Sequence, residues 1–270
     1  MLKTRVITAV VMIVVLACVL FYAPRIAWII ACALCAGVAA FEWARLTRLP
    51  AHMSAAFVVA VAVLVAGWPF LDLPAKSANF IYAPTTAIWL VLVPFWLWRH
   101  LLPQSNAFSA GAGILMIGSA SIALIELRDS STFLVLCVLG VVWVSDSMAY
   151  FVGSAIGRHK LAPNISPGKT WEGAAGGLFF VVIYAISWGY FSENVLPTRY
   201  TAGPAGWLQL SAIMLLLAVM GVYGDLFESL LKRIAGVKDS GKILPGHGGA
   251  LDRIDALLPV LPFAAWIFSA

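Results

Sequence analysis

The sequence contains few charged residues, and this feature of the composition restricts the possible class of protein more than any other. Only 11% of its 270 residues are Asp, Glu, Lys or Arg, whereas 62% are hydrophobic, and the mean hydropathy is +0.96. A soluble domain carries roughly 25% charged residues. The composition therefore excludes an ordinary soluble globular protein. Several apolar runs approach the ~20 residues that cross a bilayer as a helix, which predicts an all-α polytopic membrane protein.

Cysteine is also scarce. The chain has four, Cys18, Cys32, Cys35 and Cys137, and all of them lie within apolar runs. Cys32 and Cys35 form a C-x-x-C without a second pair or a neighbouring histidine, so small buried thiols are expected rather than a metal or redox site. No basic cluster with interleaved aromatic residues is present, which argues against nucleic-acid binding. The net charge of +5 bears instead on membrane topology and anionic partners.

Soluble domains, fixed-period repeats and low-complexity segments are missing as well. The first apolar run lacks an A-x-A-like cleavage site and is followed at once by others, so a retained helix is expected. The last of nine predicted transmembrane helices is short and interrupted by Pro259 and Pro262. The nine are predicted at 6–22, 26–41, 55–73, 82–98, 108–126, 132–152, 173–191, 207–227 and 256–269. Residues 1–130 hold the first five, and residues 131–270 form a catalytic region with loops at 154–172 and 228–255.

The distribution of positive charge predicts the orientation of these helices. All but four of the 17 Lys and Arg residues fall in the N-terminus and in alternate connections, the four exceptions being Arg25, Lys76, Arg128 and Arg199. The positive-inside rule then places the N-terminus and both long polar loops in the cytoplasm and the C-terminus outside. Glu42 is expected at the cytoplasmic interface. The short charged connection from Glu126 to Asp129 is expected to be a solvated turn on the outer side.

Polar residues are instead concentrated in one stretch, 229–255. It carries the cations Lys232, Arg233, Lys238, Lys242 and Arg253, the carboxylates Asp239, Asp252 and Asp255, His247 and several glycines. Carboxylates suit a hard divalent cation, cations suit phosphates, and glycines allow backbone N–H groups to approach a ligand. The combination indicates phosphate chemistry. A basic loop that only touches anionic headgroups would account for the lysines but not for the carboxylates.

Carboxylates upstream can join this stretch. Asp225 and Glu228 are three residues apart and share a helix face, and Asp252 and Asp255 have the same spacing. Two short helical segments joined by a glycine-rich loop can thus direct carboxylates at one Mg²⁺ ion. Asp146 lies inside an apolar run, where an unpaired carboxylate is costly, so a bound cation or a hydrated cavity is favoured over a structural ion pair.

A second polar connection contains Ser166-Pro167-Gly168-Lys169-Thr170. Pro167 and Gly168 predict a tight turn, and Lys169 lies close to the start of the next helix, where an anion is stabilised. The G-K-T triplet is not a P-loop, because the first glycine of that motif and the preceding strand are missing. Lys169 is therefore predicted to contact a phosphate.

Together these motifs resemble the signature of the phosphatidate cytidylyltransferases, or CDP-diacylglycerol synthases. The elements are S-x-x-K-R, K-D, P-x-H-G-G and D-R-x-D, with an upstream D-x-x-A-Y, an I-S-P-x-K-T-W-E-G and a G-D-L-x-E-S. They stand here as Ser229/Lys232/Arg233, Lys238/Asp239, Pro245/His247/Gly248/Gly249, Asp252/Arg253/Asp255, Asp146/Ala149/Tyr150, Ile165 to Gly173, and Gly224 to Ser229. The resemblance is close from about residue 140 onward.

The resemblance implies transfer of CMP from CTP to phosphatidic acid, in a bacterial inner membrane. It implies that Asp225 and Asp252 hold a catalytic Mg²⁺, with Asp255 and Asp146 completing that site and a second cation such as K⁺ as an option. Lys169, Lys232, Arg233, Lys238 and Arg253 would bind phosphates, with Ser229 beside them. His247, Gly248 and Gly249 would shape the nucleotide pocket.

Three other functions compete with this reading. A secondary transporter would show internal repeats and polar residues in both halves, which the chain lacks. A CDP-alcohol phosphatidyltransferase would need a D-G-x-x-A-R pattern, which is absent. A CTP-dependent lipid or polyprenol kinase would use similar metal and phosphate groups and stays open. The sequence leaves acyl-chain preference and oligomeric state undetermined, with a homodimer as one option.

Overall fold

Apolar helices make up most of the chain, as the hydropathy predicts. The structure, a computed structural model, describes residues 2–71, 77–102, 105–191, 195–243, 246 and 248–268. The α-helices are α1 (Leu2–Tyr22), α2 (Arg25–Leu46), α3 (Ala51–Gly67), α4 (Asn79–Ala87), α5 (Val93–Arg99), α6 (Asn106–Ser130), α7 (Thr132–Ile156), α8 (Trp171–Phe191), α9 (Thr198–Thr201), α10 (Gly203–Ala235), α11 (Leu251–Ile254) and α12 (Leu257–Phe268). A 3₁₀ turn, η1 (Trp68–Phe70), extends α3, and a π-helical turn, η2 (Ile88–Leu92), joins α4 to α5. Two short strands, β1 (Lys160–Ala162) and β2 (Ser166–Thr170), complete the described elements.

Each of the nine predicted spans coincides with a helix or a continuous helical run. Within the described residues, seven are long and apolar enough to cross a membrane: 25–46, 51–70, 79–99, 106–130, 132–156, 171–190 and 203–235. Val10–Tyr22 and Leu257–Phe268 are shorter apolar helices. The membrane class is therefore confirmed, while the count of nine spans is not.

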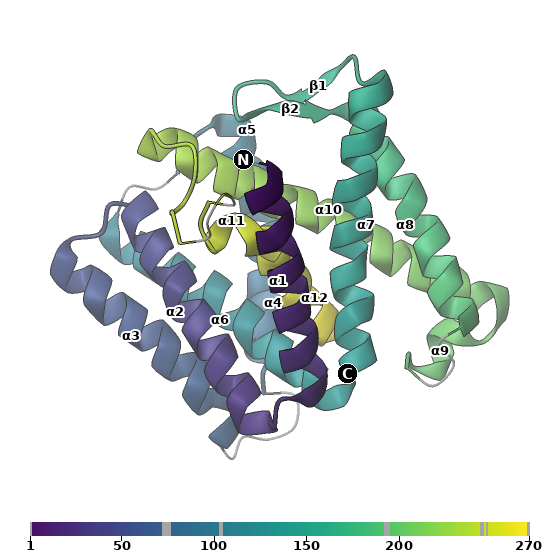
Figure 1. Ribbon diagram of the computed structural model, residues 1–270, viewed down its shortest axis with the longest axis horizontal. Coiled ribbons are helices and arrows are strands. Elements are labelled where there is room, and N and C mark those ends of the chain that lie inside the picture. Colours follow the sequence, from purple (N-terminus) through teal and green to yellow (C-terminus); the bar gives the residue numbers. More distant parts are fainter. Residues whose placement is uncertain are drawn as a thin grey trace.

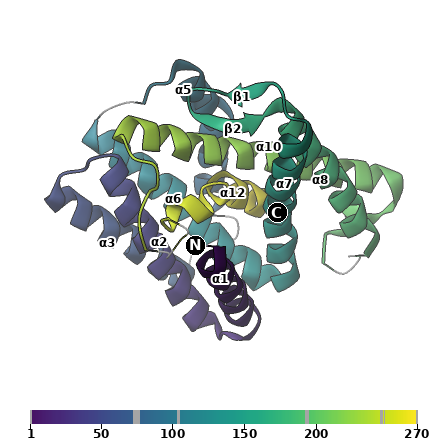
Figure 2. The same ribbon diagram turned by 45° about the horizontal axis from the view of Figure 1, so that its top comes forward.

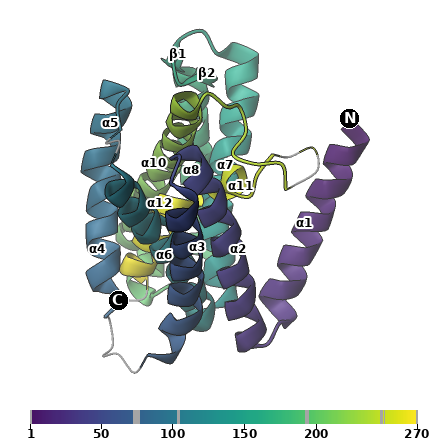
Figure 3. The ribbon, with the colours of Figure 1, turned by 90° about the vertical axis from the view of Figure 1, so that its left-hand side faces the viewer.

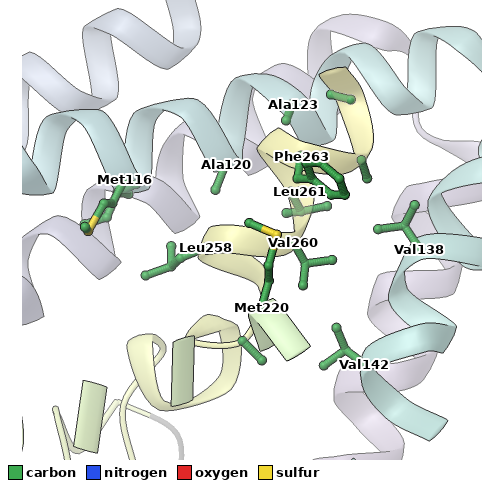
Figure 4. Close-up of a cluster of buried hydrophobic side chains, with 14 of the residues drawn as sticks. Met116, Ala120, Ala123, Val138, Val142, Met220, Leu258, Val260, Leu261 and Phe263 are labelled. Carbon is green, nitrogen blue, oxygen red and sulfur yellow. The ribbon is translucent and has the colours of Figure 1, made fainter. Parts of the chain in front are cut away.

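The last helix, α12, lies in the core of the bundle. Leu258, Val260, Leu261 and Phe263 are all buried, and the helix packs against α4, α6 and α10. Figure 4 shows these side chains among Met116, Ala120 and Ala123 of α6, Val138 and Val142 of α7, and Met220 of α10. At about 1.5 Å per residue its 12 residues extend only ~18 Å, less than the ~30 Å apolar thickness of a bilayer. This helix is therefore too short to cross the bilayer by itself and lies buried within the protein.

Helices α7 and α8 form the closest helix pair. A Cβ at Gly173 would lie 2.6 Å from the Ala149 carbonyl oxygen, and one at Gly177 would lie 2.7 Å from that of Ser145. Small residues at this spacing let two helix backbones approach, as is common in membranes. The antiparallel β1–β2 hairpin connects the two helices and projects from one end of the bundle (Figure 1).

The two ends of the bundle carry different elements. The N-terminal end of α1 lies toward the hairpin end (Figures 1 and 3), and α9 lies at the opposite end (Figure 1). The C-terminal end of α12 joins α9 there, because Arg199 of α9 donates a hydrogen bond of 3.1 Å to the Ile267 carbonyl.

The charged connection around Glu126 is not the solvated turn predicted from the sequence. Glu126 accepts hydrogen bonds from the Trp68 indole (3.2 Å) and the Tyr82 hydroxyl (2.9 Å). Arg128 donates to the Leu20 carbonyl at 2.9 Å and lies over the Trp28 ring. These side chains tie α6 to its neighbours because helix packing turns them inward, which sequence spacing did not reveal.

Candidate active site

A cavity of about 630 Å³ opens between α7, the hairpin, the start of α8, α10 and the α11–α12 junction. Its lining includes six of the residues singled out from the sequence: Asp146, Lys169, Asp225, Asp252, Arg253 and Asp255. They come from four parts of the chain. In Figure 2, α10, which carries Asp225, crosses the molecule between the hairpin and α12.

Lys169 reaches the cavity from β2 and meets Asp225 of α10. Its Nζ lies 2.7 Å from Asp225 Oδ2, and the two side chains are 24% and 31% exposed. Ser229, one helical turn further along α10, donates from its hydroxyl to Asp225 Oδ1 at 3.4 Å. An ammonium group thus lies against the carboxylate on the cavity wall.

Gly224 brings α10 against the start of α12. A Cβ at this position would lie 3.0 Å from Ala256 Cα and still closer to the Asp255 carbonyl, so the two segments touch backbone to backbone. Asp225 and Asp255 consequently line the same cavity. Burial, together with the charge of Asp225, raises the pKa of Asp255 to about 8. Ionisation of Asp255 in this cavity is therefore costly unless a cation lies beside it.

Asp252 has a different environment, because its oxygens are already engaged. Oδ1 accepts from Lys232 Nζ at 2.6 Å, and Oδ2 accepts from the backbone N–H groups of Ser240 (2.9 Å) and Gly249 (2.8 Å). Burial alone would raise the pKa of Asp252, but the contacts with Glu228, Lys232 and the Gly249 N–H outweigh it and lower that pKa to about 2. Asp252 is a fixed anion that organises the loop before it.

Lys232 lies beneath Asp252 and also contacts Glu228. The Lys232 side chain is 15% exposed, and that of Glu228 is 2% exposed. Lys232 is therefore enclosed between two carboxylates and does not line the cavity. The sequence placed it among the phosphate-binding residues, whereas its present partners are both protein groups.

The donor set fits a divalent cation that is shared with a substrate. Across the described ranges, no group of three or more His, Cys, Asp or Glu side chains is arranged as a complete metal site. Mg²⁺ takes one or two protein carboxylates and completes its shell with water and phosphate oxygens. Asp225 and Asp255, facing one cavity beside Asp146, supply that kind of partial site.

The other predicted binding residues lie around the cavity rather than in its wall. Arg233 donates from Nε to the Ile165 carbonyl at 3.1 Å and so fastens α10 to the hairpin, and Lys238 is exposed. Gly248 has a positive φ of 82°, and a Cβ there would lie 2.6 Å from Asp252 Oδ2. His247 and Pro245 of the motif lie outside the described residues.

The hairpin corrects one local prediction. Pro167 and Gly168 are not in a turn but within β2, and the turn is formed by residues 163–165. The Ile165 N–H donates to the Ala162 carbonyl at 3.1 Å across it. Pro163 and Asn164 are turn-forming residues as well, and they occupy this turn. Lys169 still lies just before the start of α8 at Trp171, as predicted.

Two features of the site were not anticipated. Glu42, expected at the interface, is fully buried beneath the loop that precedes α11. One wall of the cavity is apolar and includes Val142, Trp143, Tyr150 and Leu257. A glutamate near the end of an apolar run carries the same signal as Asp146 and could have been predicted to be buried and partnered. The apolar wall depends on helix packing and has no sequence signal of its own.

Comparison with known proteins agrees with the geometry. The model of the cytidylyltransferase family matches residues 3–270. A phosphatidate cytidylyltransferase of Haemophilus influenzae is 34% identical over 99% of both chains, and one of Pseudomonas aeruginosa is 34% identical over 100% of this chain and 98% of its own. One of Thermotoga maritima is 36% identical over 78% of this chain and 86% of its own. The match covers the N-terminal helices as well as the polar loops, and the chain belongs to the cytidylyltransferase family.

Proposed function

We propose that this chain transfers CMP from CTP to the phosphate of phosphatidic acid, giving CDP-diacylglycerol and pyrophosphate. The observation that carries the proposal is the composition of the cavity. Its polar wall holds Lys169, Arg253 and the carboxylates, and its apolar wall holds Trp143 and Tyr150. An anionic nucleotide and a lipid phosphate can meet there while the acyl chains remain among apolar side chains.

In the reaction, an oxygen of the lipid phosphate attacks the α-phosphorus of CTP. The bond between that phosphorus and the oxygen leading to the β-phosphate breaks, and pyrophosphate leaves with the electron pair. The second pKa of a phosphate monoester is near 6, so the attacking oxygen is mostly ionised at neutral pH and needs no dedicated base. Positioning and charge neutralisation therefore supply most of the catalysis.

The chain's own residues have distinct tasks in this scheme. Lys169 and Arg253, which both line the cavity, neutralise phosphate charge, and Asp252 holds the glycine loop in place. Asp225 and Asp255 would hold Mg²⁺, with Asp146 and Asp252 beside them. The ion would supply neutralisation of the triphosphate charge. A second cation such as K⁺ is compatible with the number of carboxylates.

The protein is an integral membrane protein, and its orientation belongs to the proposal. The hairpin, the cavity and the N-terminus would face the cytoplasm, where the lysine- and arginine-rich connections gather, and the C-terminus would face outward. The bacterial origin of the relatives points to the inner membrane. CTP is then supplied from the side on which the cavity is polar.

The test uses the purified full chain with phosphatidic acid, Mg²⁺ and CTP labelled at either the α- or the γ-phosphate. The expected result is α label in lipid and γ label in pyrophosphate, and γ label in lipid would instead establish a kinase. Asp225→Asn is expected to lower the rate at least about 100-fold, the order seen when a group stabilising transition-state charge is lost. Asp129→Asn, which changes an exposed carboxylate outside the cavity lining, is the matched control. Chelation of Mg²⁺ should stop transfer, and activity that survives chelation would contradict the metal assignment.

A further inference from the structure

Glu42 is a buried carboxylate that has no role in the transfer reaction proposed above. It lies near the C-terminal end of α2, far in sequence from the polar loops, and its side chain has no exposed surface. A carboxylate in such a position is costly unless hydrogen bonds or a cation compensate it. The hydrogen-bond partners of Glu42 therefore indicate its role.

Among the described residues, the hydrogen-bond partners of Glu42 are Ser240, Ala250 and Leu251. Oε2 accepts from the Ser240 hydroxyl at 2.8 Å and from the Leu251 N–H at 2.8 Å, and Oε1 accepts from the Ala250 N–H at 3.1 Å. Among the residues with described side chains, no Lys or Arg forms an ion pair with Glu42. The loop alone satisfies this carboxylate, so the two order each other.

Ser240 links Glu42 directly to the active site. Its hydroxyl lies 2.8 Å from Glu42 Oε2 and 3.0 Å from Asp252 Oδ2, and its N–H donates to the same Asp252 oxygen at 2.9 Å. In space, Ser240 thus bridges the carboxylates of Glu42 and Asp252. Displacing Glu42 would release the hydroxyl that spans the two carboxylates.

The contact between the loop and Glu42 also explains why two positions of the loop are glycines. A Cβ at Gly241 or at Gly249 would come closer than 3.0 Å to the Glu42 carboxylate. These positions therefore need glycine so that the loop can close over Glu42. Part of the H-G-G motif serves this closure in addition to the nucleotide pocket.

We propose that Glu42 is a positioning residue of the transfer site: it holds residues 240–241 and 249–251 against α2 so that Asp252 faces the cavity. The proposal rests on the proposed function and gives the N-terminal helices a part in it. Glu42 touches no substrate in this scheme and acts through Ser240 and Asp252.

The variant Glu42→Gln tests this, because it keeps the shape of the side chain while turning one acceptor into a donor that faces N–H groups. Glu126→Gln is the matched control, since Glu126 is also a hydrogen-bonded carboxylate of a helix but lies outside the cavity lining. Both full-length proteins are purified and treated with trypsin. Lys238 and Lys242 are exposed cleavage sites just before and within the loop, and Arg158 and Lys160 are exposed sites at the hairpin.

The expected result is cleavage about tenfold faster after Lys238 and Lys242 in Glu42→Gln only, the ratio that fits one lost hydrogen bond to a charged group. Cleavage after Arg158 and Lys160 should not change. The KM for CTP should rise about tenfold in Glu42→Gln and stay unchanged in Glu126→Gln. Ser240→Ala should also accelerate cleavage after Lys238 and Lys242. This variant tests the proposal if Glu42→Gln does not fold.

Wild-type cleavage rates at Lys238 and Lys242 would overturn the proposal, as would equal acceleration at all four sites or in both glutamate variants. Cleavage needs neither CTP nor lipid. A wild-type chain that transfers no cytidylyl group would therefore refute the function without affecting the cleavage result. Normal transfer with unaltered cleavage would refute only the role of Glu42.

Discussion

At the scale of single residues, two neighbouring cations of α10 have different surroundings. Lys232 is enclosed between Glu228 and Asp252, whereas Arg233 is exposed and contacts the Ile165 carbonyl. Lys232→Gln should therefore lower the free energy of unfolding by about 3–5 kcal/mol, because it leaves two buried carboxylates without a counter-charge. Arg233→Gln should cost about 1 kcal/mol, since only one partly exposed hydrogen bond is lost. Denaturation of both variants in detergent measures the difference, and equal stabilities would contradict it.

Sequence reasoning identified individual residues well where chemistry made them unusual. Asp146 was predicted from its cost inside an apolar run, and it lines the cavity with Asp225 and Asp255. Lys232 was recognised as part of the site, but its partners were not, because nothing in the spacing shows that its ammonium points inward. Glu42 was left at the interface because its partners lie about 200 residues further along the chain. Which residues meet across such a separation is decided by helix packing.

At the scale of elements, the contact between α10 and the start of α12 decides whether the site forms. Gly224 touches the Asp255–Ala256 backbone, whereas a Cβ at Gly221, one turn earlier, would find atoms no nearer than 3.7 Å. Gly224→Ala should force the two segments apart and separate Asp225 from Asp255, lowering transfer at least about 100-fold, as expected when catalytic groups are misplaced by ~1 Å. Gly221→Ala should keep most of the activity. Transfer assays on the two variants check this, and similar activities would contradict it.

The elements themselves were largely predictable, because apolar runs of this length have few alternatives in a bilayer. Their detailed geometry was not. The hairpin turn was predicted at Pro167–Gly168, although Pro163 and Asn164 carry an equally good turn signal and form it. From the sequence alone, the glycines of α7 and α8 look like ordinary residues of membrane helices. Their close packing, which sets Asp146 beside Lys169, becomes visible only when both helices are in place.

At the scale of the whole molecule, α12 fixes the depth of the site. It is buried on nearly all sides, extends only ~18 Å, and ends beside α9 at the end of the bundle away from the hairpin. Asp255, just before its first residue, therefore lies well inside the protein rather than at its surface. Helices α4 and α6 of the N-terminal half pack against α12 and so enclose this part of the protein.

The orientation of the molecule can be tested with two exposed positions at opposite ends. Lys160 lies on the hairpin, and Ser130 lies at the α6–α7 connection. Because the positive-inside rule places the hairpin in the cytoplasm, a membrane-impermeant thiol reagent should label Ser130→Cys in intact spheroplasts. It should label Lys160→Cys only after the membrane is opened. The unsubstituted chain, whose four cysteines lie in apolar helices, provides the background. The reverse pattern would put the cavity on the outer face, away from CTP, and would contradict the proposed orientation and the positive-inside reading together.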